Sequence, residues 1–231
     1  MSELHFVGGE KGGVGKSVMA RLIAQHWIDQ NKPWHGFDTD RSHGALLRYY
    51  KEYATPVEIS RVEDLDKIIE LASQPDKRVL VDLAAQTERD LHAWVESGDL
   101  LELAGEANLK VVFWHVMDDG KDSVDLLGRL LARYGQRANY VVVFNRGRGE
   151  NFAMYQGSPV AAEVARLGVP TIQLPALHKG TMLKIDQLDK SFWAAVNHRE
   201  TETEKGLGMM ERQRVKVWLR NAYAQLDQLG V

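Results

Sequence analysis

The chain has 231 residues, of which 44% are hydrophobic, and contains no cysteine. That length suits one domain with an ordinary core, and the lack of cysteine excludes disulfides, thiolate zinc sites and cysteine-held iron–sulfur clusters. The 29 basic and 32 acidic residues give a net charge of −3, so composition offers no general argument for nucleic-acid binding. Without a membrane-length apolar run or a signal-type start, we expect a cytoplasmic protein.

Short apolar runs alternate with amphipathic stretches along the chain. We expect strands at residues 4–7, 34–38, 79–83, 109–116, 140–144 and 169–174. Helical spacing predicts helices from Lys16, at 46–53, around 65–72, after a capping box that starts at Thr87, around 124–134 and beyond Lys179, with loops at 145–158 and 198–208. Such alternation predicts an α/β fold with a mostly parallel central sheet and helices on both faces, in a single domain over 1–231.

A glycine-rich segment lies between the first expected strand and the first expected helix. Residues 9–17 have the sequence GEKGGVGKS, in which glycines let backbone amides surround phosphate oxygens and the following helix adds its positive dipole end. Lys16 supplies a charge for the β- and γ-phosphates, and the Ser17 hydroxyl is the usual magnesium ligand. We therefore expect a P-loop NTPase fold. The expected nucleotide-binding residues here are Gly12, Gly13, Val14, Gly15, Lys16, Ser17 and Val18.

The run KGGVGKS at residues 11–17 resembles the deviant Walker A motif of the ParA/MinD ATPases. In that family the residue before the first lysine varies, so Glu10, which stands where a strict P-loop has glycine, fits the pattern. The resemblance implies ATP and Mg²⁺ as cofactors and an ATP-dependent sandwich homodimer. In such a dimer Lys11 would reach the partner's phosphates and act like an arginine finger, as a catalytic residue beside Lys16.

Two carboxylate motifs extend this resemblance. Asp38-Thr39-Asp40 ends the second expected strand, where α/β sheets place functional side chains. The resemblance implies that Asp40 positions the attacking water and that Asp38 helps to organise magnesium. The family often continues with Pro-Gln, whereas this chain has Arg41-Ser42, which leaves the geometry of this loop open. The alternative is an ordinary strand-end turn.

Asp82 closes the apolar run 79–81 and fits Walker B, whose carboxylate orients magnesium-bound water. Gln86 follows at a position where many relatives carry a glycine. Gln86 could assist the water, or its presence could mean slow hydrolysis, and the sequence leaves both interpretations open.

The sequence favours adenine over guanine. Residues 145–148 read NRGR and lack the aspartate that reads guanine in Ras-type proteins. The resemblance implies that Asn145 bonds the adenine edge and, more weakly, that Pro175 lies in a second base-contacting segment. The alternative for Asn145 is a loop residue that caps a turn.

The C-terminal residues, about 207–229, predict an amphipathic helix. Its apolar face contains Val215, Trp218, Leu219, Ala222, Leu226 and Leu229. Its other face carries Arg212, Arg214, Lys216 and Arg220. This helix could bind nonspecific DNA or a membrane surface, could serve a protein partner, or could simply dock on the domain with its arginines solvated.

Most of the chain resembles the small ParA-like ATPases of conjugative plasmids, of the StbB, TraL and MobD kind, through the segments ending at Ser17 and Arg41. This resemblance implies a slow, partner-stimulated ATPase that acts in plasmid stability, positioning or conjugative transfer. It also implies a plasmid-encoded partner and association with the nucleoid or membrane in the ATP state. A weakly hydrolysing ATP-binding adaptor is the main alternative. A third possibility is a small-molecule kinase, but the sequence shows no acceptor-binding signature.

Overall fold

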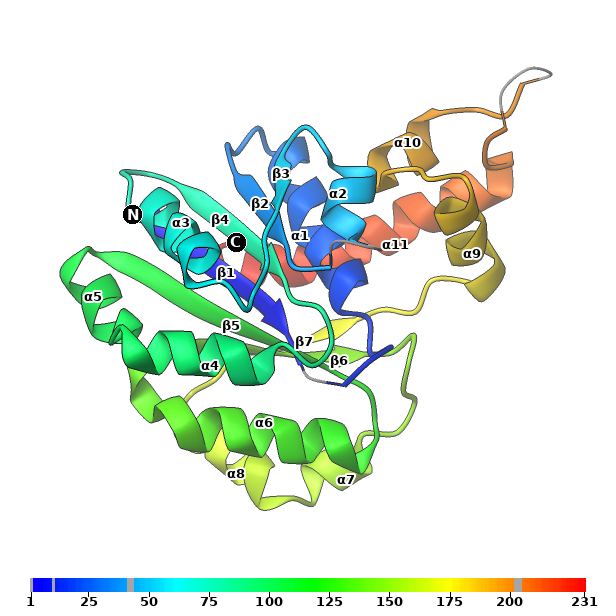
Figure 1. Ribbon diagram of the computed structural model, residues 1–231. Helices are drawn as coiled ribbons and strands as arrows, with labels where there is room; N and C mark the ends of the chain where they lie inside the picture. The colour runs from blue at the N-terminus through cyan, green and yellow to red at the C-terminus, as the bar shows by residue number, and fades with distance from the viewer. Residues whose placement is uncertain (1, 10, 41–43, 202–204) are drawn as a thin grey trace.

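The computed structural model describes residues 2–9, 11–40, 44–201 and 205–231. Its centre is a seven-stranded sheet in the order β3-β2-β4-β1-β5-β6-β7, in which every pairing is parallel (Figure 1). The strands are β1 Ser2–Gly8, β2 His35–Asp38, β3 Ala54–Pro56, β4 Arg78–Asp82, β5 Leu109–Met117, β6 Asn139–Asn145 and β7 Thr171–Leu174. The predicted α/β class with a mostly parallel sheet is confirmed.

Helices cover both faces of this sheet, as Figure 1 shows for α4 and α6 on one side and α1 and α11 on the other. The first face carries α3 Val62–Ala72, α4 Glu88–Ser97, α5 Leu100–Glu106, α6 Lys121–Tyr134, α7 Ala153–Gln156 and α8 Pro159–Arg166. The second carries α1 Lys16–Asp29, α2 Ala45–Tyr49, α9 Lys179–Gln187, α10 Phe192–Asn197 and α11 Met209–Gln228. A short 3-10 turn, Gly135–Arg137, follows α6.

The central strands are apolar on both faces because each face has its own core. Phe6 belongs to the core under α4 and α6, whereas the next residue, Val7, belongs to the core under α1. Val79 and Leu80 divide between the two cores in the same way. Each fully buried side chain of this kind stabilises the fold by about 1.5–3 kcal/mol. Parallel pairing then brings the carboxyl ends of all the strands to one edge, where ligands bind in such sheets.

Several local predictions need correction. The helix expected at 46–53 ends at Tyr49, and the chain then forms the edge strand β3, where Pro56 is tolerated because an edge residue need not donate to a neighbour. The capping box predicted at Thr87 is wrong: the Thr87 hydroxyl accepts no hydrogen bond from the first turn of α4, and it donates to the carbonyl of Ala84 at 2.9 Å. The expected loop 145–158 contains α7, and α5 and α8 were not predicted.

None of the helices within the described part of the chain combines the length and the apolar character that crossing a bilayer requires.

Candidate functional site

The phosphate-binding loop connects the end of β1 at Gly8 with the start of α1 at Lys16. Gly9, Gly13 and Gly15 have φ values of 124°, 79° and 103°, a region that residues with a side chain rarely adopt. A Cβ at Gly15 would also come within 2.2 Å of the Asn145 amide nitrogen. A Cβ at Gly12 or Gly13 would meet no described atom within 4 Å. The loop therefore needs its glycines for its path and borders open space at Gly12 and Gly13.

Lys16 lies at the start of α1 and is only 7% exposed. Its ammonium donates to the carbonyl of Lys11 at 2.9 Å, which folds the side chain back along the loop. Burial lowers the pKa of Lys16, and the charge of Asp82 opposes that change. The arrangement holds a cation over the loop, beside the expected Walker B carboxylate.

Asp82 and Asp38 are register partners at the ends of β4 and β2, and both are buried, with 3% and 1% exposed. Burial, with the charge of Asp38 second, raises the pKa of Asp82 to about 8, although a hydrogen bond with Ser17 opposes this. The Asp82 Oδ1 atom has no hydrogen-bond partner among the described residues. A buried carboxylate with an unsatisfied oxygen, next to an exposed serine hydroxyl, fits a divalent cation, so Ser17 and Asp82 suit Mg²⁺.

Asp38 differs from Asp82 because backbone amides occupy both of its oxygens. Oδ1 accepts from the N–H of Asp40 at 3.0 Å, and Oδ2 accepts from the N–H of Leu46 at 2.9 Å and of Leu47 at 3.3 Å. Burial nonetheless raises the pKa of Asp38. The side chain therefore fixes the start of α2 and the backbone that presents Asp40. Residues 41 and 42, on which the departure from Pro-Gln falls, lie outside the described residues, as does Glu10.

Thr39 connects the two carboxylate motifs, a role that the sequence did not suggest. Its hydroxyl donates to the carbonyl of Asp82 at 3.1 Å and accepts from the N–H of Ala84 at 2.7 Å. Its own N–H also donates to the Asp82 carbonyl. Further along this segment Gln86 is exposed and has a φ of 65°. Gln86 thus adopts the left-handed backbone that glycine takes most easily, at a cost of about 1–3 kcal/mol.

Lys11 does not project freely from the loop. Its ammonium pairs with both carboxylate oxygens of Asp118, at 3.1 Å and 2.8 Å, and the Lys11 side chain is 30% exposed. Asp118 directly follows β5 and was not among the predicted site residues. Only the position of Asp118 after a buried strand could have drawn attention to it.

Asn145, at the end of β6, is buried and contacts backbone with both polar atoms of its side chain. Its Nδ2 donates to the carbonyl of Val14 at 2.7 Å, and its Oδ1 accepts from the N–H of Gly147 at 2.9 Å. In this structure Asn145 therefore caps its turn and braces the phosphate loop. The carbonyl of Pro175 accepts a hydrogen bond from the Trp218 indole at 2.7 Å, which links this segment to α11.

The apolar face of α11 packs on the domain. Val215, Trp218, Leu219, Ala222 and Leu226 are buried, and the Trp218 ring meets Phe192 edge-on with centroids 5.0 Å apart. On the other face Arg214, Lys216 and Arg220 are exposed, whereas Arg212 is partly buried. The apolar residues that would enter a membrane are thus already buried in the core under α1.

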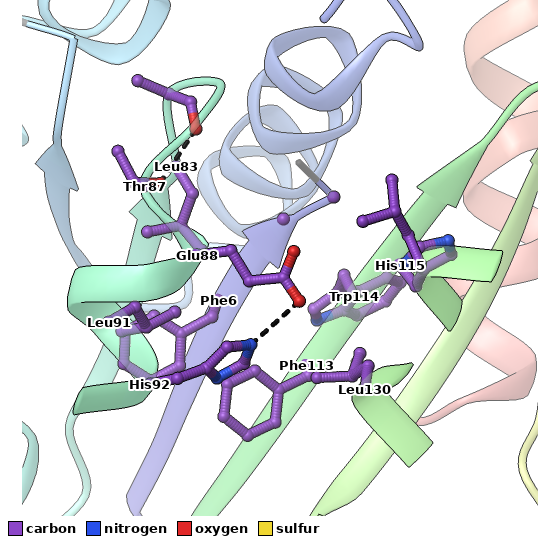
Figure 2. A pocket seen from close by; sticks show the side chains of 14 residues that line it. Phe6, Leu83, Thr87, Glu88, Leu91, His92, Phe113, Trp114, His115 and Leu130 are labelled. Carbon is purple, nitrogen blue, oxygen red and sulfur yellow. Dashed lines mark hydrogen bonds and ion pairs between the residues drawn. The ribbon is translucent and has the colours of Figure 1, made fainter. Parts of the chain in front are cut away.

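A small cavity lies beside the phosphate loop, between α4 and β5. Figure 2 shows Glu88 and His92 on one side of it and Trp114 and His115 on the other. Glu88 and His92 pair at 3.0 Å, and burial lowers the pKa of His115 to about 4. At about 40 Å³ the cavity is far smaller than the roughly 300–1,000 Å³ of ligand pockets, so it is not the nucleotide site.

Comparison with known proteins finds relatives over the whole chain, although no family model matches it. TraL of Escherichia coli is 26% identical over an alignment of 243 positions that covers 100% of both chains. MobD of Acidithiobacillus ferrooxidans is 28% identical over an alignment of 178 positions that covers 74% of this chain and 77% of MobD. The expected relationship to TraL and MobD is confirmed.

The solved structures that resemble this chain share its fold. The MinD cell division protein of Aquifex aeolicus superimposes with a TM-score of 0.53 over 97% of each chain, at 15% identity. A nucleotide-binding protein of Archaeoglobus fulgidus, solved with ADP, gives a TM-score of 0.51 at 16% identity, over 81% of this chain and 86% of the other. These likenesses confirm the predicted fold, which this chain shares with MinD and with the ADP-bound protein.

Proposed function

We propose that this ParA/MinD-type protein, related to TraL and MobD, binds ATP with Mg²⁺ and hydrolyses it slowly as an ATP-dependent homodimer. The observation that carries the proposal is the glycine loop with Lys16 at the start of α1, set beside Ser17 and the incompletely bonded, buried Asp82. The role implied by the relatives is a switch in plasmid stability, positioning or conjugative transfer, with a plasmid-encoded protein as partner.

Each residue of the site then has a defined task. The loop amides and Lys16 bind the β- and γ-phosphates, and the start of α1 adds its dipole. Mg²⁺, held by Ser17 and Asp82, supplies positive charge that offsets the charge of the phosphates. Asp38 fixes the backbone so that Asp40, at the end of the same segment, can orient the attacking water. Lys11 of the opposite subunit stabilises charge on the transferring phosphoryl group.

Base selection rests on Asn145 and Pro175. The chain lacks an aspartate in the position that reads guanine, so we expect ATP to bind more tightly than GTP. Because Asn145 bonds Val14 and Gly147 in this structure, contact with adenine requires its amide to exchange at least one of these partners. The hydrogen bonds of Asn145 would then link recognition of the base to the conformation of the phosphate loop.

A weakly hydrolysing adaptor is the second candidate, and Gln86 favours it. Many relatives carry a glycine there, whose N–H contacts the γ-phosphate. Gln86 keeps the left-handed backbone but adds an exposed side chain at that point. An adaptor would bind ATP and recruit its partner without measurable turnover.

The docked position of α11 favours binding to nonspecific DNA over binding to a membrane. Arg214, Lys216 and Arg220 are exposed, while Trp218 is buried on the domain. In the ATP-bound dimer this basic face occurs twice, which strengthens a weak phosphate contact through effective concentration. We therefore propose nucleoid association of the ATP state.

The test is calorimetric titration of ATP, ADP and GTP with and without Mg²⁺, combined with turnover measurements and light scattering of an Asp40→Ala variant. We expect ATP to bind at least tenfold more tightly than GTP, and the Asp40→Ala protein to double its mass with ATP alone. Lys16→Ala should lose ATP binding while keeping its fold. A folded Lys16→Ala protein with unchanged ATP affinity refutes the site, and an ATP-bound monomer refutes the dimer.

A further inference from the structure

The pairing of Lys11 with Asp118 is a contact of the phosphate loop that the proposed function does not use. It joins the phosphate loop to the end of β5, 107 positions away in the sequence. The two oxygens of the carboxylate lie 3.1 Å and 2.8 Å from the lysine nitrogen. The residue expected to act on a second subunit is thus held by its own subunit.

Asp118 is itself fixed in place. Its Oδ1 accepts from the Ser123 hydroxyl at 2.7 Å and from the Gly120 N–H at 3.1 Å. The pKa of Asp118 lies below its usual value. Burial acts to raise this pKa, but the hydrogen bonds from Lys11, Ser123 and Gly120 together outweigh burial, so the carboxylate stays ionised. Lys11 therefore meets an oriented anion.

Gly120 makes room for this contact. A Cβ at Gly120 would lie 2.8 Å from the Lys11 nitrogen and 3.2 Å from Asp118 Oδ1. The Gly120 backbone has φ −82° and ψ 155°, which any residue adopts, so conformation alone does not require glycine there. A methyl group at this position would instead displace the lysine ammonium, which is the movable end of its side chain.

We propose that Asp118 is the resting dock of Lys11, which must leave it before Lys11 can reach the phosphates of a second subunit. This inference rests on the proposed ATP-dependent dimer and names a control on its assembly. Because the contact is partly exposed, Lys11 can leave Asp118 without disrupting the core. The triphosphate bound to the partner carries more negative charge than one carboxylate, so it can replace Asp118 as the partner of the ammonium. The docked population lowers the apparent tendency to dimerise, because only the undocked fraction is competent.

Two variants that act by different means should release Lys11. Asp118→Asn keeps an oxygen for Ser123 and Gly120 but removes the charge. Gly120→Ala keeps the charge but places a methyl group against the ammonium. Asp125→Asn, which loses an exposed carboxylate paired with Lys121 on the same helix, is the matched control.

The experiment is an ATP titration followed by light scattering, with all variants in an Asp40→Ala background to suppress hydrolysis. If Lys11 is docked about nine-tenths of the time, both releasing variants should lower the ATP concentration at half-dimerisation by about 3- to 10-fold. The control should not change it. Adding Lys11→Ala to Asp118→Asn should abolish dimerisation, because the gain depends on the freed lysine.

Amine labelling of the nucleotide-free protein, read by mass spectrometry, tests the dock without a dimer. Lys11 should label several-fold faster in Asp118→Asn and Gly120→Ala, while Lys16 stays unchanged. Unchanged labelling of Lys11 overturns the dock, and faster labelling with an unchanged dimerisation midpoint overturns its control of assembly. If the Asp40→Ala parent does not dimerise at any ATP concentration, the proposed function fails first, and the labelling still decides whether the dock exists.

Discussion

Replacing Asp82 with asparagine should stabilise the nucleotide-free protein and, under the proposed function, remove its binding of Mg²⁺. Asp82 is buried at the end of β4, its neighbour Asp38 carries a like charge, and one of its oxygens has no partner among the described residues. Asparagine has nearly the same shape, can accept the hydrogen bond from Ser17, and carries no charge. The buried charge of Asp82 therefore lowers the stability of the nucleotide-free protein, which is the cost that the proposed cation site implies.

The size of this cost follows from the pKa of Asp82, which burial raises from 3.8 to about 8. Below pH 4 both the folded and the unfolded chain hold the proton, so there is no penalty. Between about pH 4 and pH 8 the unfolded chain ionises while the folded one keeps its proton, so stability falls as pH rises; above pH 8 the penalty is constant. At 1.36 kcal/mol per pKa unit, the penalty is about 2 kcal/mol at pH 5 and about 4 kcal/mol at pH 7.

Urea denaturation of the metal- and nucleotide-free proteins at these two pH values measures the effect. Asp82→Asn should exceed the wild type by about 4 kcal/mol at pH 7 and by about 2 kcal/mol at pH 5. Asp125→Asn, an exposed carboxylate, should stay within about 0.5 kcal/mol at both. An Asp82→Asn protein that is no more stable than the wild type at pH 7, or that keeps the same pH dependence, refutes the argument.

Three further outcomes can be measured on the same protein. Thr39→Val removes both hydrogen bonds of the hydroxyl and should destabilise the protein by about 2 kcal/mol relative to Thr39→Ser in urea denaturation. ATP turnover should likewise be lower in Thr39→Val than in Thr39→Ser. Trp218→Ala should cost about 3–5 kcal/mol, because it empties a buried site against Phe192; a smaller loss than 1 kcal/mol would mean that α11 is not docked. Replacing Arg214, Lys216 and Arg220 together should leave stability almost unchanged but reduce the log–log salt slope of DNA binding by about 0.9 for each phosphate that the variant no longer neutralises. An unchanged slope would exclude this face as the DNA-binding surface.

Much of the fold could be predicted because its signals are local. The strands β1, β4, β5 and β6 contain short apolar runs, because strands that are buried on both faces carry apolar side chains on both. The errors fell where a tertiary contact outweighed local preference. Tyr50 is buried and its hydroxyl bonds Gln25 of α1, so the chain leaves the helix at Tyr49 and continues into β3. The Thr87 hydroxyl donates to the carbonyl of Ala84 in the turn after β4 and makes no cap bond to α4.

The site divides in the same way. The glycine loop, Lys16 and Asp82 could be proposed as site residues because each lies at a fixed offset from a recognisable strand or helix. The contacts of Lys11 with Asp118 and of Asn145 with Val14 join residues 107 and 131 positions apart, and no spacing in one sequence encodes them. Both contacts engage the polar atoms that the family resemblance assigns to ATP or to a second subunit. Under the proposed roles of Lys11 and Asn145, ATP binding and dimerisation break existing bonds as well as form new ones, so the measured affinity is a difference in free energy between two bonded states of the loop.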